Sequence, residues 1–131
     1  MATMKLLLDT HALLWWLFDA PELSSTARSP LADTSNRAFV SAASAWEIAT
    51  LVRLGRLEAA RPLMDGYDGW IARAGFSELP VLAQHAILAG SIDSPHRDPF
   101  DRMLAAQARL EDLILLNRDL AMDGLGARRI W

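Results

Sequence analysis

Two short apolar runs near opposite ends of the chain place the strongest constraint on its fold. Met4–Leu8 is interrupted only by Lys5, and Leu113–Leu116 is uninterrupted. Runs of this length without polar alternation predict strands buried on both faces, which is typical of a parallel sheet covered by helices on both sides. Each run ends just before an acid, Asp9 or Asp119. We therefore expect an α/β fold with carboxylates at the ends of buried strands.

Helical and strand patterns alternate along the rest of the chain. We expect further strands at Ala38–Val40, Leu79–Val81 and Ala127–Trp131. The segments with helical spacing are Thr10–Phe18, Ala42–Leu54, Leu57–Gly75, Leu82–Ser91 and Pro99–Leu110. This alternation predicts a mostly parallel sheet of about five strands, and such sheets bind ligands at the carboxyl ends of their strands.

Length and composition predict one domain over residues 1–131. Hydrophobic residues make up 52% of the chain and charged residues 22%, which is enough apolar material for one core. The absence of cysteine excludes disulfides, zinc–thiolate sites and thiol catalysis. No apolar run approaches the roughly 20 residues of a membrane span, so we expect no membrane association and a cytoplasmic location.

The net charge of −3 excludes a uniformly basic nucleic-acid-binding surface, so any nucleic acid would bind locally. The only lysine, Lys5, follows no glycine loop, which excludes a P-loop. All other cations are arginines, a bias that reflects either phosphate binding or the base composition of the genome. Arg97, Arg102 and Arg118 flank acids, where they would contact the phosphates of a nucleic acid or balance the carboxylates.

Glu47 is an acid on an apolar helical face. With Ala43, Leu51 and Leu54 it follows the spacing of one side of a helix. An ionised glutamate there is costly unless it is paired or binds a metal, and the alternative is a side chain that reaches solvent or a backbone group.

Asp98 and Asp101 begin the last long helix. Asp98 fits the N-cap, Pro99 the first helical position, and Asp101 the first turn, where a carboxylate favours the helix dipole. Capping alone would explain both acids. Asp101 nevertheless shares a face with Leu104 and looks toward the core, so we favour Asp101 as a metal ligand and Asp98 as a cap or supporting acid.

Asp9, Glu47, Asp101 and Asp119 together would form a site of oxygen ligands. Such a set suits Mg²⁺, with Mn²⁺ as an alternative, rather than zinc. Hard cations bind phosphates, lower the pKa of water and stabilise a leaving oxygen, which is the chemistry of metal-assisted phosphodiester hydrolysis.

Four fragments of the chain, in order, resemble the PIN-domain ribonucleases, most closely the VapC toxins of type II toxin–antitoxin systems. The opening strand ends in Leu8-Asp9-Thr10-His11, Ser44–Ile48 carries the glutamate, His96–Leu104 carries the third acid, and Asn117–Asp119 is similar to the closing motif. The resemblance implies a PIN-like three-layer α/β/α sandwich. It also implies that Asp9, Glu47, Asp101 and Asp119 bind the metal, with Thr10, Asp98 and Asn117 in support.

The resemblance further implies a Mg²⁺-dependent endoribonuclease that cuts RNA such as tRNA or rRNA, forms a homodimer and is inhibited by a VapB-type antitoxin. One departure is Asn117, where the family often has Thr or Ser; its amide can make a similar hydrogen bond. The five tryptophans, including Trp15 and Trp16, fit either a groove for a partner or plain core packing.

Two other classes of protein remain as alternatives. A receiver-like phosphoacceptor domain needs a lysine near its aspartates, and Lys5 lies inside the first strand. A catalytically silent PIN-fold module that binds nucleic acid or protein is disfavoured by the presence of all four acids. The histidines His11, His85 and His96 are more simply structural than catalytic.

Overall fold

The computed structural model describes residues 3–131. Its helices and strands, in chain order, are β1 (Lys5–Leu8), α1 (Thr10–Leu17), α2 (Ser25–Ala32), β2 (Arg37–Ser41), α3 (Ala42–Arg53), the 3₁₀ segment η1 (Glu58–Met64), α4 (Tyr67–Arg73), β3 (Ser77–Leu79), α5 (Ala83–Ser91), α6 (Pro99–Leu110), β4 (Ile114–Leu116), the 3₁₀ segment η2 (Leu120–Leu125) and β5 (Arg129–Ile130).

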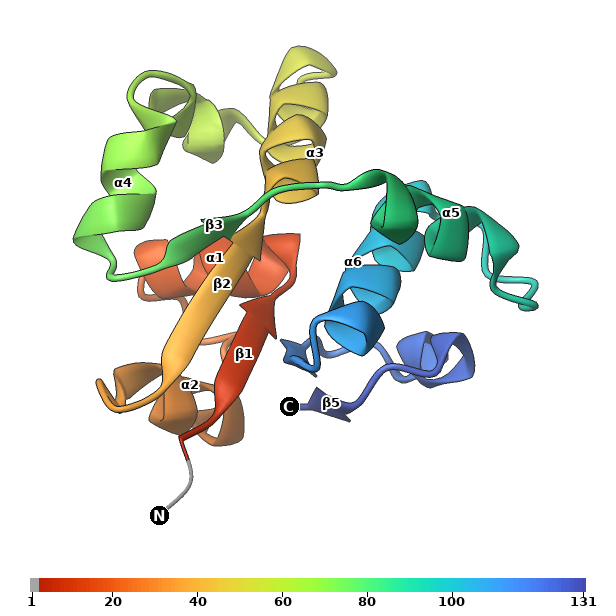
Figure 1. The fold of residues 1–131 in the computed structure, drawn as a ribbon. Helices are drawn as coiled ribbons and strands as arrows, with labels where there is room; N and C mark the ends of the chain where they lie inside the picture. The colour runs from red at the N-terminus through yellow and green to blue at the C-terminus, as the bar shows by residue number, and fades with distance from the viewer. Residues whose placement is uncertain (1–2) are drawn as a thin grey trace.

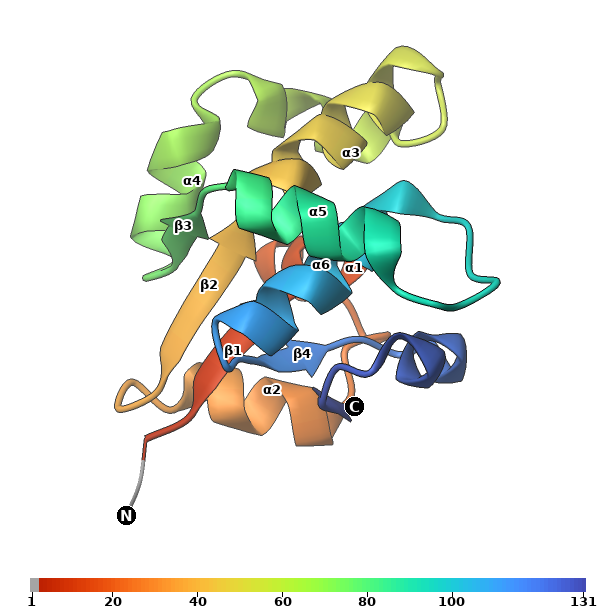
Figure 2. The same cartoon turned by 45° about the vertical axis from the view of Figure 1, so that its right-hand side comes forward.

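The five strands form one sheet in the order β3-β2-β1-β4-β5, and every pairing is parallel. The two apolar runs form its centre, where Leu7 pairs with Phe39 on one side and Leu115 on the other. Figures 1 and 2 show the helices arranged on either side of the sheet. The prediction of a three-layer α/β/α fold with about five mostly parallel strands is confirmed.

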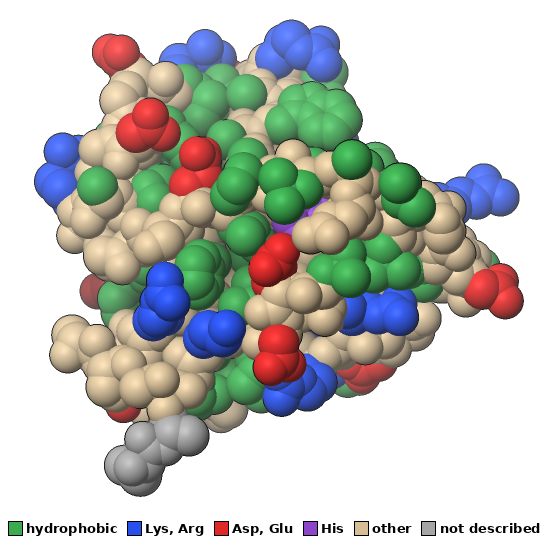
Figure 3. Space-filling view, viewed as in Figure 1, with side chains coloured by type: hydrophobic (Ala, Val, Ile, Leu, Met, Phe, Trp, Pro, Cys, Tyr) green, Lys and Arg blue, Asp and Glu red, His purple; other side chains and the backbone are tan. Residues whose placement is uncertain are grey.

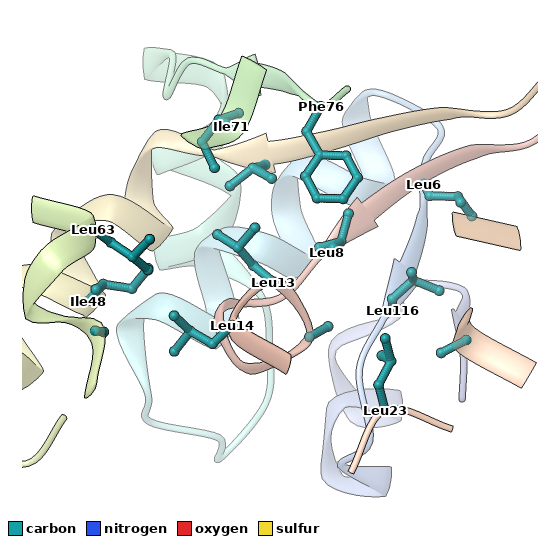
Figure 4. Packing of buried hydrophobic residues seen from close by; sticks show 14 of the residues in the cluster. Leu6, Leu8, Leu13, Leu14, Leu23, Ile48, Leu63, Ile71, Phe76 and Leu116 are labelled. Carbon is teal, nitrogen blue, oxygen red and sulfur yellow. The ribbon is translucent and has the colours of Figure 1, made fainter. Parts of the chain in front are cut away.

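Alternation along the central strands divides the core in two. Leu6, Leu8 and Leu116 pack on the face covered by α1 and α2, as Figure 4 shows for the labelled side chains. Leu7 and Leu115 point the other way and pack against apolar residues of α6. Because helices cover both faces, every position of these two strands after the exposed Lys5 is apolar, which explains the two apolar runs.

Neighbouring parallel strands end side by side at the sheet's carboxyl edge. Leu8 pairs with Leu116, and the backbone N–H of Asp9 donates to the carbonyl of Leu116 at 3.1 Å. The residues that follow β1 and β4 are thereby fixed next to one another, although more than a hundred positions separate them in the chain.

Three elements differ from the prediction. The helix predicted over Leu57–Gly75 is two elements, η1 and α4, because Pro62 lies inside the first and Gly66 turns the chain with a left-handed φ of +80°. Strand β3 ends at Leu79, where we expected it to begin, since Pro80 cannot continue the ladder. The helix α2 was not predicted at all.

Among residues 3–131, no helix combines the length and apolar character needed to cross a bilayer.

Candidate active site

Asp9 lies between the end of β1 and the start of α1. One carboxylate oxygen caps the helix, accepting from the backbone N–H of Ala12 at 2.7 Å, and the other accepts from the Asn117 amide at 2.7 Å. The residue is buried, with 9% of its surface exposed. The pKa of Asp9 is raised to about 7, chiefly by burial; the charges of Asp101 and Glu47 contribute to this rise, and the two hydrogen bonds oppose it.

Glu47 reaches the same region from α3. It is half-buried, and burial raises the pKa of its carboxyl, with Asp98 and Asp101 adding to the effect. The nearby Thr10 hydroxyl acts in the opposite direction. Thr10 itself is buried and donates to the Ser44 hydroxyl oxygen at 3.1 Å, which joins the first turns of α1 and α3.

Asp98 and Asp101 occupy the two positions expected at the start of α6, one at the N-cap and one facing inward. Asp98 is exposed and caps the helix, accepting from the N–H groups of Phe100 and Asp101. Asp101 faces inward and is hydrogen-bonded to His96 Nε2 at 2.8 Å. Burial raises the pKa of Asp101, the charges of Asp98 and Asp119 add to this, and the His96 bond lowers it.

Asp119 follows β4 and begins η2. One of its oxygens accepts from the N–H of Ala121 at 2.9 Å, while its own N–H donates to the Asn117 side-chain oxygen at 2.6 Å. Asn117 is buried and therefore has both ends of its amide engaged, one by Asp9 and one by Asp119. It is the bridge between the two strand-end acids.

One pocket of about 590 Å³ is lined by all four of the acids proposed as ligands, Asp9, Glu47, Asp101 and Asp119. Thr10, Asp98 and Asn117 lie in its wall as well. The structure thus brings together every acid that the sequence singled out, from β1, α3, α6 and the loop after β4. Their role as metal ligands stays a prediction.

The charges of the acids raise one another's pKa values, but their side chains do not form a tight cluster. Within residues 3–131, no three acid or histidine side chains are close enough to hold one ion together. Asp9, Asp101 and Asp119 instead accept hydrogen bonds from neighbouring donors. A hard divalent cation would favour the ionised carboxylates and offset their repulsion, so the chemistry of these donors, though not their spacing in this structure, suits Mg²⁺ or Mn²⁺.

The three arginines predicted to contact RNA lie in different surroundings. Arg118 is exposed, lines the pocket and stacks over the Trp15 ring with 4.7 Å from its guanidinium carbon to the ring centre. Arg97 is exposed near the start of α6. Arg102 differs from both, because its guanidinium donates to the backbone carbonyls of four residues, Ala89, Ile92, Ser94 and His96.

These bonds give Arg102 a structural role: its guanidinium holds the end of α5 and the following loop against α6. Its contact with RNA stays a prediction. The sequence carried no signal for the structural role, because the partners of Arg102 are backbone carbonyls at the end of α5 and in the loop that follows.

The three histidines also lie in different surroundings. His11 lines the pocket and packs on Trp15 with ring centres 5.7 Å apart, and His96 holds Asp101. His85 is fully buried away from the pocket, where its ring nitrogens bond the N–H of Leu82 and the carboxylate of Glu111. The Trp15 ring, which contacts both His11 and Arg118, was not predicted as part of the site. Its spacing of four residues from His11 places both residues on one helical face.

Comparison with known proteins gives both a family and a set of similar folds. A family model described as PIN domain matches residues 6–126. No sequence among the curated proteins matches the chain.

Solved structures share the fold at low sequence identity. A chain in the crystal structure of VapBC2 from Rickettsia felis bound to a promoter DNA fragment matches with a TM-score of 0.70 at 13% identity, covering 97% of this chain and 98% of that one. A chain of FitAcB from Neisseria gonorrhoeae matches with a TM-score of 0.65 at 18% identity, covering 98% and 97%. A toxin–antitoxin complex from Klebsiella pneumoniae matches at 0.51 and 16%, covering 87% and 86%.

Proposed function

The chain belongs to the PIN domain family, and from this premise we propose that it is a metal-dependent endoribonuclease, the toxin of a type II toxin–antitoxin module. The observation that carries the proposal is the convergence of Asp9, Glu47, Asp101 and Asp119 on one pocket. Burial and mutual repulsion raise the pKa values of three of them, Asp9, Glu47 and Asp101. Neighbouring carboxylates repel one another, so this arrangement does not stabilise the fold and favours a functional role for the acids.

The four acids would hold Mg²⁺ or Mn²⁺. When bound, the cation would neutralise the scissile phosphate and lower the pKa of the attacking water. To hold the cation, the carboxylates must be ionised and correctly oriented. Asn117 orients Asp9 through its amide, and His96 orients Asp101 through Nε2. Arg118, whose guanidinium lies over the Trp15 ring at the pocket wall, would contact a phosphate of the bound RNA.

The proposed partner is a VapB-type antitoxin. The support is the fold, which matches chains of toxin–antitoxin complexes over nearly the whole of both sequences. We expect such a partner to place a basic side chain against the acid pocket, where it would compete with the cation. Expression of the chain alone should arrest bacterial growth, and co-expression of a cognate antitoxin should relieve the arrest.

A second copy of the chain is the other proposed partner. Trp46 on α3 and Ile87 on α5 expose 63% and 69% of their surfaces. Figure 3 shows hydrophobic side chains gathered over α5 and the neighbouring part of α3. Beside them lies an apolar pocket of about 400 Å³ lined by Trp46, Val81, Phe100 and Met103, among others. A homodimer would cover this face.

The direct test is cleavage of total tRNA and rRNA by purified, antitoxin-free protein, with Mg²⁺, Mn²⁺ or EDTA. Discrete fragments should form only with the metal. Asp9→Asn should abolish them, while Asp65→Asn, which makes the same charge change at an exposed acid outside the pocket, should not. Metal-dependent RNA binding without cleavage would instead identify a catalytically silent binding module.

A further inference from the structure

His96, in the loop before α6, is held at three points. Its carbonyl accepts from Arg102 Nη1 at 2.8 Å, its backbone N–H donates to Ser94 Oγ at 3.2 Å, and its ring Nε2 is hydrogen-bonded to Asp101 Oδ2 at 2.8 Å. Two of these contacts come from consecutive residues of α6, Asp101 and Arg102. One helix therefore holds the same loop residue by its ring and by its backbone.

The loop that carries His96 depends on side-chain bonds for its shape. The described chain has no helix or strand between Ser91 and Pro99. The carbonyls of this segment therefore lack the regular backbone bonds of a ladder, and the Arg102 guanidinium supplies donors to three of them. Such a spread of acceptors matches a planar guanidinium, whereas the single ammonium of a lysine cannot reach all of them.

The bond from His96 engages only one oxygen of Asp101. Oδ2 is bonded to the imidazole, and Oδ1 has no hydrogen-bond partner among residues 3–131. Asp101 lines the acid pocket, and 24% of its side chain is exposed. A carboxylate that is held through one oxygen keeps the other for a ligand, and contacts of this kind set the orientation of carboxylates that bind metals.

Loop stability alone is the competing explanation for these bonds, and Arg109 provides a comparison. It lies about two turns further along α6 and also donates to a backbone carbonyl, that of Leu125 at 3.3 Å. Leu125 belongs to η2 and, like Arg109, is not among the residues that line the acid pocket. Arg102 differs because one of its carbonyl partners belongs to the residue whose ring holds Asp101.

We propose that Arg102 is a positioning residue of the acid pocket. By holding the carbonyl of His96, its guanidinium presents the imidazole to Asp101 Oδ2 and leaves Oδ1 available to a cation. The proposal rests on the function proposed above and adds to it a route from Arg102 through His96 to Asp101. It goes beyond stabilisation of the loop, because loss of the guanidinium should change the contact at Asp101 in protein that is still folded.

The first measurement uses the metal-free protein and is independent of catalysis. Long-range proton–nitrogen NMR spectra of the imidazoles, recorded at one pH, report whether His96 Nε2 is hydrogen-bonded, and His96→Ala assigns the signal. Arg102→Lys should move this signal from that of a ring bonded to a carboxylate to that of a ring in solvent. Arg109→Lys should leave it unchanged. Ser94→Ala, a milder change that removes the acceptor of the His96 N–H, should move it part of the way.

The second measurement is a double-mutant cycle for Mn²⁺ binding, followed by titration calorimetry. Arg102→Lys and His96→Ala should each weaken Mn²⁺ binding about tenfold, the loss typical for a residue that orients a metal-binding carboxylate. The double variant should bind no more weakly than His96→Ala alone, because both changes act through Asp101. Arg109→Lys should not change the affinity.

An unchanged His96 signal in folded Arg102→Lys would overturn the inference, and if that variant does not fold, an unchanged signal in Ser94→Ala would do so. Losses of Mn²⁺ affinity that multiply to about a hundredfold in the double variant would also overturn it, since Arg102 would then act independently of His96. If wild type binds Mn²⁺ and the His96 signal does not move, only this inference fails. If the signal moves as expected and wild type binds no Mn²⁺, the positioning is supported and the proposed function fails.

Discussion

The Asn117 amide donates to the Asp9 carboxylate at 2.7 Å and links the ends of two adjacent strands that are 108 residues apart in sequence. The same side chain accepts from the N–H of Asp119 at 2.6 Å. Asn117 therefore sets the position of two of the four acids, and its amide favours the ionised form of Asp9. The hydrogen bond expected of this position in the sequence is present, made by an amide where the family often has a hydroxyl.

Removal of the Asn117 amide should weaken metal binding most at low pH. Without this donor the pKa of Asp9 lies above its value of about 7, so more protons must be displaced when a cation binds. We expect Asn117→Ala to lower Mn²⁺ affinity roughly tenfold at pH 6.5 and much less at pH 9. Titration calorimetry at both pH values measures this. Asn117→Thr restores a donor and should recover much of the loss; a pH-independent effect would contradict the argument.

The metal-free protein should lose stability as the pH rises toward neutrality. Burial lifts the pKa of Asp9 from its ordinary 3.8 to about 7. For an acid shifted upward, the contribution to stability is fully present below the unfolded value and is lost as the pH rises through the folded one. Each pH unit in this window changes the free energy of unfolding by about 1.4 kcal/mol.

Asp9→Asn removes that dependence. In EDTA, the free energy of unfolding of the variant relative to wild type should rise by roughly 2 kcal/mol between pH 5.5 and pH 7. Urea denaturation at the two pH values gives the difference. A relative stability that stays constant with pH would show that Asp9 keeps an ordinary pKa. A large loss at both pH values would mark its cap on α1 as the dominant role.

Arg102 should prove to be a stabilising residue. Its guanidinium bonds four carbonyls at the end of α5 and in the loop before α6, and a lysine can replace few of them. We expect Arg102→Lys to lower the free energy of unfolding by roughly 2–4 kcal/mol. Arg97→Lys, an exposed neighbour with no such bonds, should change it little. Denaturant melts of both variants decide the matter.

The parts of the fold that could be predicted from sequence are those with a strong apolar signal. Met4–Leu8 and Leu113–Leu116 were recognisable because burial on both faces requires a continuous apolar run, and the strands β1 and β4 lie within them. Their position at the sheet centre then placed Asp9 and Asp119 together, since parallel strands share a carboxyl edge. The family drawn from the motifs is likewise confirmed by the match over residues 6–126.

The helix α2 had no comparable signal. It buries only Ala27 and contains Pro30, so its sequence shows neither an apolar stripe nor a favourable helical composition. Its start is defined instead by a local contact, the Ser24 hydroxyl accepting from the N–H of Ala27 at 3.1 Å. Helices held by caps and by packing on a neighbour's apolar residues are difficult to detect in one sequence.

The finer organisation of the site depended on three-dimensional contacts. The bond between His96 and Asp101, the stacking of Arg118 on Trp15 and the choice of carbonyl partners for Arg102 all arise from loop geometry. Residue type alone gives each of these side chains several equally reasonable partners. The sequence therefore predicted which acids lie together, but it did not predict which side chains contact them.

The apolar face over α3 and α5 predicts an oligomer that a single charge should disrupt. Ile87 and Trp46 are largely exposed, and burying both against a second copy would remove apolar surface from water without any polar partner to satisfy. We expect Ile87→Glu and Trp46→Glu each to shift the protein from dimer to monomer in light scattering at micromolar concentration. Phe18→Glu, which adds the same charge at an exposed aromatic residue after α1, is the matched control and should leave the dimer intact. If wild type is monomeric at high concentration, or if all three variants behave alike, this face is not a homodimer interface, and the antitoxin becomes the occupant to test there.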